Sequence, residues 1–161
     1  MMGASVGGFV ASGNIFSAFR RPPFIRSLLR IDSQATVLAM AREELAEGFV
    51  VLVTAAESGG AFELFEISGR IGPPMHVHDE HVECFYVLQG EVTFRVVNSV
   101  IRARPGECAV VPRGTPHRFT GTTDARMILL VSPAGLEEYF RQLLGGTGRE
   151  ELATRFDSHP V

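Results

Sequence analysis

Short runs of β-branched and aromatic residues recur through the middle of the chain, and glycine, proline or asparagine separates them. Several runs alternate between apolar and polar positions, as strands with one buried face do. The expected turns at residues 89–91 and 98–99 join neighbouring runs. Many short strands with such turns predict an all-β sandwich or barrel. The runs lie at residues 49–54, 62–67, 83–88, 92–97, 100–102, 107–111 and 126–131.

One segment near the C-terminus has helical rather than strand periodicity. Ser132 suits the N-cap, Pro133 suits the first turn, and Gly145 with Gly146 ends the pattern. We expect a helix with one apolar face, packed on the outside of the barrel. The apolar positions are Leu136, Tyr139, Phe140, Leu143 and Leu144.

The 161 residues suit a single globular domain with extensions at both ends. We expect an N-terminal arm over residues 1–35, a barrel with its helix over 36–146, and a frayed polar tail over 147–161. Arginines and apolar residues interleave between positions 20 and 30. This pattern suits a surface-binding helix, but a loosely ordered arm, or one packed on a partner subunit, is the favoured interpretation.

Charge and cysteine content exclude several classes of protein. A net charge of −3 argues against a nucleic-acid binder, which would usually carry a basic excess. No apolar run approaches the ~18 residues of a membrane span. No basic residue precedes the first apolar stretch, so we expect no secretory signal and a cytoplasmic location. Cys84 and Cys108 are too few for a disulfide framework, and two buried thiols are favoured over a bridge.

Four of the five histidines fall in two short segments that together predict a metal site. His76 and His78 are two residues apart and would share one face of a strand. Glu83 follows across a short connection, and a later segment supplies His117. Imidazoles with one carboxylate suit a divalent transition metal, such as iron, manganese, nickel, cobalt or zinc. On a six-coordinate ion, these ligands would leave two positions for substrate or dioxygen.

The residues around this predicted site have more than one interpretation. His81 could be an alternative ligand, a partner of a ligand or a solvated loop residue. We expect Asp79 and Glu80 to be exposed and Tyr86 to face outward. A set of apolar residues could line a pocket for a planar substrate, although each alone is more typical of a barrel core. The set is Phe62, Phe65, Met75, Phe85, Phe94, Phe119 and Met127.

The two segments resemble the two motifs of the cupin superfamily. In the first, His76-x-His78 is followed by four residues, Glu83, six residues and Gly90. The opening glycine, Gly69 or Gly72, is out of register, because Arg70 holds the expected place. In the second, Gly106 is followed by five residues, Pro112-x-Gly114, two residues and His117. Gly121 stands where the second motif has asparagine. Flanking stretches resemble small single-domain cupins described as quercetin 2,3-dioxygenase-like.

The resemblance implies a cupin jelly-roll barrel with the four metal ligands named above. It implies a metal-dependent dioxygenase acting on a small aromatic or enolisable molecule, with Glu83 as the general base. Alternatives are a non-redox zinc lyase, isomerase or cyclase, and a protein that binds a small ligand through its metal without catalysis. Small cupins commonly pair, and an exposed strand edge gives a physical route to a homodimer.

Overall fold

The computed structural model describes residues 27–30, 36–39, 42–70 and 72–161. Most of the expected arm therefore lies outside the described residues. Of the arm, β1 (Ser27–Arg30) is described, and it pairs as a separate two-stranded sheet with β2 (Thr36–Ala39), which was expected to belong to the barrel. In the described part of the chain, no helix is long and apolar enough to cross a membrane.

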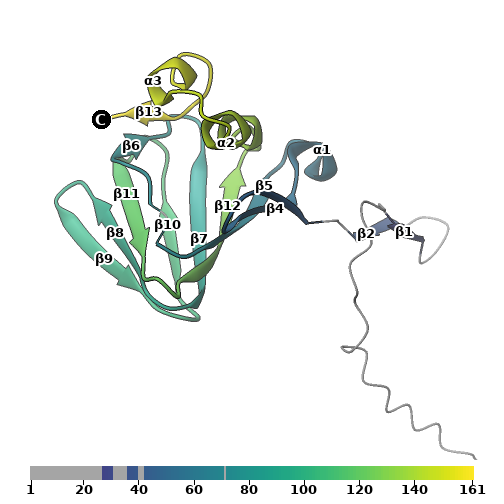
Figure 1. The fold of residues 1–161 in the computed structure, drawn as a ribbon, viewed down its shortest axis with the longest axis horizontal. Coiled ribbons are helices and arrows are strands. Elements are labelled where there is room, and N and C mark those ends of the chain that lie inside the picture. Colours follow the sequence, from purple (N-terminus) through teal and green to yellow (C-terminus); the bar gives the residue numbers. More distant parts are fainter. Residues whose placement is uncertain (1–26, 31–35, 40–41, 71) are drawn as a thin grey trace, which may run out of the picture.

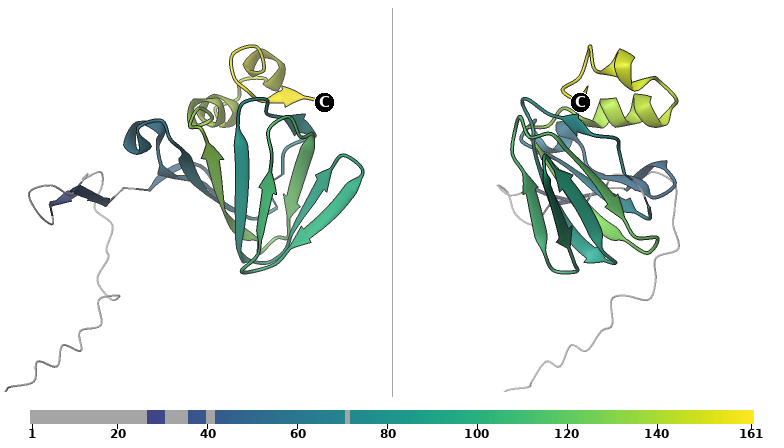
Figure 2. Two further views of the ribbon diagram at one scale, coloured as in Figure 1. Left: turned by 180° about the vertical axis from the view of Figure 1, so that it is seen from behind. Right: turned by 90° about the vertical axis from the view of Figure 1, so that its left-hand side faces the viewer.

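Two antiparallel sheets form the barrel, as Figures 1 and 2 show, and confirm the all-β jelly-roll prediction. The first sheet has the order β10 (Cys108–Val111), β7 (Val82–Gln89), β12 (Arg126–Ser132), β5 (Glu63–Ser68), β4 (Phe49–Val53), β3 (Glu43–Ala46). The second has the order β13 (His159–Pro160), β6 (His76–Val77), β11 (His117–Gly121), β8 (Val92–Val96), β9 (Ser99–Ala103).

The core lies between the sheets and consists of the inward positions of alternating strands. Phe85 is fully buried on β7, whereas its neighbour Tyr86 is 42% exposed, as the alternation predicts. The Phe85 ring lies 5.0 Å from that of Phe94 and 4.9 Å from that of Phe119. These rings join strands of both sheets. Their burial is a large part of what holds the barrel together.

The position of the β8–β9 turn and the burial of the cysteines differ from the sequence prediction. The turn between β8 and β9 occupies Val97 and Asn98, one residue earlier than expected, because Val96 pairs directly with Ser99. The cysteines are free, but they are not both buried: Cys84 is half-buried and Cys108 is exposed. Both lie on the outer face of the first sheet, opposite Val110 and Tyr86.

The C-terminal helix begins later than predicted. α2 spans Glu137–Leu144, and Ser132 instead ends β12, where its hydroxyl donates to the carbonyl of Ala61. The buried carboxylate of Glu63, on β5, accepts the N–H groups of Leu136 and Glu137 at 2.9 and 3.1 Å. A residue distant in sequence thus caps this helix, which local pattern could not show. The predicted end at Gly145 is confirmed.

The tail after residue 147 does not fray, which corrects the prediction. It forms α3 (Arg149–Leu152) and then β13, which pairs antiparallel with β6. Leu152 is fully buried, and Phe156 packs against the core. A few apolar residues are enough to fold this segment back onto the barrel. Figures 1 and 2 show α2 and α3 together at one end of the barrel, beside β6 and β13.

A short helix, α1 (Ala55–Ser58), connects β4 to β5. Thr54 and Glu57 form a capping box at its start, each side chain bonding the other's backbone N–H. The Ala55 N–H donates to Glu137 at 3.2 Å. This contact ties the connection to the start of α2.

Candidate functional site

The four predicted ligands come together in one buried cluster. His76 lies on β6, His78 just after it, Glu83 on β7 and His117 on β11, and all four are buried. One donor atom from each lies within 4.8 Å of the donors of the others. Three strands from two sheets therefore aim their side chains at a single point. This cluster is able to hold a metal ion.

Hydrogen bonds on the far side of each imidazole orient the three rings. The Nδ1 atoms of His76 and His117 donate to the carbonyls of Pro74 and Thr115 at 3.0 and 2.9 Å, and that of His78 donates to the carbonyl of Asp157. A carbonyl can only accept, so each Nδ1 carries a proton, which leaves Nε2 as the atom of each ring available to a metal ion. This is the usual arrangement of histidines that bind metals.

The Nε2 atom of His78 is buried without a hydrogen-bond partner among the described residues. Buried polar atoms are rarely left unsatisfied, because the lost hydration costs about 1–3 kcal/mol. The nearest acidic atom is Glu83 Oε1, at 3.6 Å. An ion at the centre of the cluster would satisfy this nitrogen. The donor set therefore fits a divalent transition metal.

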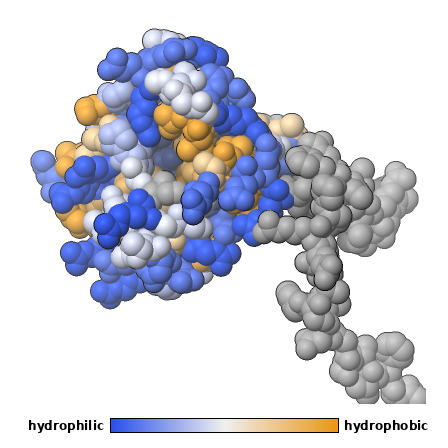
Figure 3. All heavy atoms as spheres, in the orientation of Figure 1, coloured by the Kyte–Doolittle hydropathy of each residue, from blue (hydrophilic) through white to orange (hydrophobic). Residues whose placement is uncertain are grey.

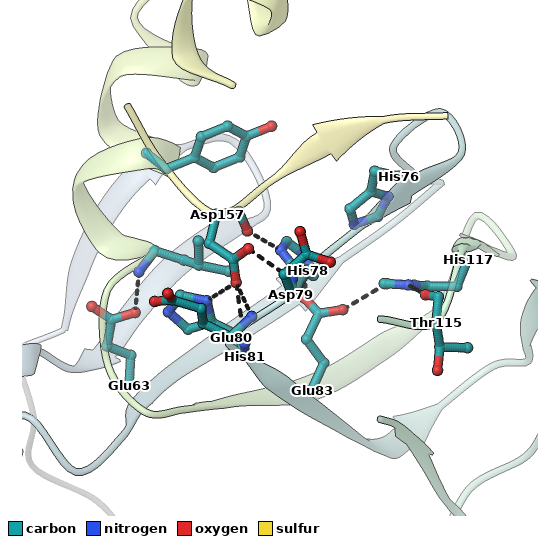
Figure 4. Close-up of polar contacts among 12 residues, drawn as sticks. Glu63, His76, His78, Asp79, Glu80, His81, Glu83, Thr115, His117 and Asp157 are labelled. Carbon is teal, nitrogen blue, oxygen red and sulfur yellow. Dashed lines mark hydrogen bonds and ion pairs between the residues drawn. The ribbon is translucent and has the colours of Figure 1, made fainter. Parts of the chain in front are cut away.

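Glu83 is the single carboxylate of the cluster, and its Oε2 lies 2.7 Å from Nε2 of His117 (Figure 4). Burial alone would raise the pKa of Glu83. The hydrogen bond from His117 and the charges of the surrounding histidines outweigh burial and lower it. The carboxyl is therefore ionised at neutral pH.

Two histidines of the cluster differ in their affinity for a proton. Burial, followed by the nearby His117, lowers the pKa of His76 to about 4, so its ring is neutral at pH 7. Burial also lowers the pKa of His117, but the hydrogen bond to Glu83 and its charge raise it overall. His117 and Glu83 thus share a proton that an incoming cation would displace.

Asp157 is a supporting residue that the sequence did not reveal. Its carboxylate accepts the backbone N–H groups of Asp79, Glu80 and His81 at 2.7, 2.8 and 3.1 Å. Burial would raise the pKa of Asp157, but hydrogen bonds from the His81 side chain and from this backbone lower it to about 2. The same residue orients His78 through its carbonyl. Figure 4 shows the contacts of Asp157 with His78 and His81.

His81 is not a solvated loop residue, because it is 6% exposed and its Nδ1 lies 2.5 Å from Asp157 Oδ2. This contact makes it a partner of the supporting residue, outside the four-residue cluster. Asp79 and Glu80 are exposed, as expected. The apolar residues Leu152 and Phe156 were the signal in the sequence that the tail returns to the barrel.

A cavity of about 100 Å³ adjoins the cluster, with His76, His78 and Glu83 in its wall. Of the expected pocket residues, only Phe119 lines it, while Phe65, Phe85, Phe94 and Met127 form the core. Figure 3 shows apolar residues around a hollow on this face of the molecule. The apolar lining consists mainly of Phe49, Ile67, Phe119, Leu129, Phe140 and Leu143.

Helix α2 contributes to this cavity, which corrects the expectation that it only packs outside the barrel. Tyr139, Phe140, Leu143 and Leu144 lie in the cavity wall, together with Arg149 of α3. The helical pattern correctly indicated an apolar face but not what that face covers. The C-terminal elements form one wall of the cavity.

The glycine at position 121, where the cupin motif has asparagine, has a steric reason. A Cβ atom there would lie 2.7 Å from the Cβ of Ala125 and 2.7 Å from the carbonyl oxygen of Gly69. A larger side chain does not fit. Gly72 is similarly confined, because a Cβ would lie 2.1 Å from the carbonyl oxygen of Phe119.

Comparison with known families agrees with this geometry. Residues 64–133, which contain the four clustered side chains, match the Cupin domain family. This match supports a place for the chain in the cupin superfamily. The chain is also 32% identical over 69 residues to quercetin 2,3-dioxygenase of Bacillus subtilis (strain 168). The match covers 42% of this chain and only 20% of that relative.

Several solved structures resemble this chain in fold. KdgF from Halomonas sp. has a TM-score of 0.47 and 20% identity, over 58% of this chain and 88% of that one. The Streptomyces protein Pac13, described as a nucleoside dehydratase, has a TM-score of 0.48 and 20% identity, over 61% and 79%. A sugar phosphate isomerase from Silicibacter pomeroyi has a TM-score of 0.44 and 23% identity, over 55% of this chain and 61% of that one.

Proposed function

We propose that this protein is a metal-dependent dioxygenase acting on a small aromatic or enolisable molecule, with His76, His78, Glu83 and His117 as the metal ligands. The observation that carries the metal site is the unpartnered Nε2 of buried His78, which faces the other three donors. The partial match to quercetin 2,3-dioxygenase supports the choice of reaction. A divalent transition metal bound there would act as a Lewis acid that lowers the pKa of a substrate hydroxyl.

Side chains and backbone groups of the protein accept the proton, bind the substrate and position the ligands. Glu83, ionised and buried at the cavity wall, accepts the proton of the substrate hydroxyl as general base. The apolar walls hold a planar body and exclude water. The carbonyls behind the three imidazoles keep the donor atoms in place.

Metal content tests the site directly. Protein purified without an affinity tag or added metal is expected to carry about one equivalent of transition metal by elemental analysis. His76→Ala and His117→Ala should lose this metal, because each removes one of the few donors. The control, Glu44→Gln, should keep it, because Glu44 is exposed on β3 and belongs to none of the candidate metal groups. Full metal retention in both alanine variants would contradict the site.

Oxygen uptake tests the reaction. Protein loaded with iron, manganese, nickel or cobalt is expected to consume dioxygen with flavonols or related enols. Glu83→Gln should slow turnover by about a hundredfold or more, since general bases contribute on that order. Turnover without oxygen uptake would contradict a dioxygenase.

A non-redox lyase, isomerase or cyclase is the second candidate. One observation favours it: the phenol of Tyr139 and the carboxylate of Glu83 line the same cavity from different elements. Such a pair could supply an acid and a base without an oxidant. Resident zinc and turnover under argon would support this candidate. A bound small ligand without any turnover would instead indicate a binding protein.

A further inference from the structure

The cavity has a second polar end, which also adjoins His76 of the metal cluster. Arg149 is the only arginine or lysine in the cavity wall within the described part of the chain. Its Nη1 donates to the hydroxyl of Tyr139 at 3.1 Å. No carboxylate of the described residues lies within ion-pair distance of this guanidinium. The guanidinium keeps unused donors beside a cavity whose wall is mainly apolar.

Tyr139 completes this polar end. Its side chain is buried, at 2% exposure, and its oxygen accepts from Arg149, so its own hydrogen remains free to donate. Ser158, 4% exposed, lies in the same wall. A guanidinium and a phenol hydroxyl side by side match the two oxygens of a carboxylate.

We infer that Arg149 and Tyr139 form an anion subsite, so that the substrate is a small amphipathic acid. Its carboxylate would bind this pair, and its apolar body would lie between Phe49, Phe119 and Leu143. A phenolic or enolic oxygen would face the cluster. This inference rests on the proposed function for the role of that last oxygen. The carboxylate subsite itself stands on the geometry of Arg149 and Tyr139.

The test compares 4-hydroxyphenylacetate with its neutral amide by calorimetric titration. Measurements use the protein as purified and after chelator treatment, because a bound metal could itself attract a carboxylate. Wild type is expected to bind the acid about tenfold more tightly than the amide in both forms, as charge-assisted pairing implies. Equal affinity for acid and amide in the chelated wild type would overturn the inference.

Variants show which residue causes the preference for the acid over the amide. Arg149→Gln should bring the acid to within about twofold of the amide, and Arg149→Lys should retain part of the difference. The control Arg118→Gln removes an equal charge from an exposed position on β11 and should keep the full preference. Loss in both glutamine variants would indicate a long-range effect of net charge and would also overturn the subsite.

Tyr139→Phe provides a second measurement that keeps the ring packing. It should weaken acid binding a few-fold and leave amide binding unchanged; an unchanged acid affinity would remove Tyr139 from the subsite. Metal titration of wild type and Arg149→Gln separates the two proposals.

If neither protein binds metal, but wild type prefers the acid and Arg149→Gln does not, the proposed function is refuted and the carboxylate subsite is retained.

Discussion

At the scale of single residues, the site depends on groups that hold the ligands as much as on the ligands. Asp157 orients His78 through its carbonyl and holds residues 79–81 through its carboxylate. No local pattern connects a tail residue to a motif 79 positions away. The two cupin motifs themselves could be recognised in the sequence, because their ligands share faces at fixed spacing.

Removing the Asp157 carboxylate should weaken metal binding. In Asp157→Ala, the backbone N–H groups of residues 79–81 lose their acceptor and His78 is less well fixed, so affinity should fall about tenfold or more. Competition with a chelator measures the affinity, and the visible spectrum of the cobalt-loaded protein reports altered coordination. Asp79→Asn, an exposed change in the same loop, is the control. Unchanged affinity and spectrum in Asp157→Ala would refute the positioning role.

At the scale of elements, alternation located β4, β5, β7, β8, β9, β10 and β12, because the two faces of each strand differ in burial, but it did not single out β3, β6 or β11. The helix was located by its period, but its cap was not, because Glu63 lies 73 residues before Leu136. The folding of the tail was not predicted either, because α3 and β13 depend on packing against the barrel rather than on local propensity. Local patterns therefore predict elements, whereas contacts between elements decide caps, cavity walls and supporting residues.

The β8–β9 turn contains a strained residue that can be improved. Val97 has a φ of 50°, the one positive value among the non-glycine residues described, and a β-branched side chain is poorly suited to it. Val97→Asn should stabilise the protein by about 1 kcal/mol, because asparagine tolerates this conformation. Thermal denaturation should show a midpoint a few degrees higher. The matched change Val100→Asn, on the adjacent strand, should give no such gain; equal gains would argue against strain.

At the scale of the whole molecule, one buried carboxylate couples folding to pH on the outer face of the first sheet. Glu66 lies 2.8 Å from both Arg126 and Arg42. The hydrogen bond from Arg126 is the main cause that lowers the pKa of Glu66 below its ordinary 4.5. A lowered folded pKa means that the pair stabilises the protein above pH 4.5 and that this contribution is lost as the pH falls further.

Glu66→Gln should therefore cost about 0.5–1 kcal/mol near pH 7 and progressively less toward about pH 3. Denaturant unfolding across this pH range measures the difference from wild type. Glu44→Gln, at an exposed position on β3, serves as the control and should show a smaller, flatter difference. If the difference in unfolding free energy between wild type and Glu66→Gln stays constant with pH, charge pairing is not the cause of that difference.

The first sheet also offers a surface through which two copies could pair. β10 is an edge strand, so one side of its backbone has no neighbouring strand within the described residues. Val110, on β10 itself, is 61% exposed, and Tyr86, on the neighbouring β7, is 42% exposed. An apolar sheet edge of this kind favours association with a second copy, which would pair β10 with β10 about a two-fold axis. We propose this edge as the interface of the homodimer that the sequence led us to expect.

Light scattering coupled to size exclusion tests this assignment. Wild type should have the mass of a dimer at micromolar concentration. Val110→Glu should shift it to a monomer, because the new carboxylate would be forced against its copy across the axis. Ile101→Glu places the same charge at a residue that is 50% exposed on β9, in the other sheet, and should leave the dimer intact. A monomeric wild type would refute the dimer, and dissociation by Ile101→Glu alone would move the interface to the opposite sheet.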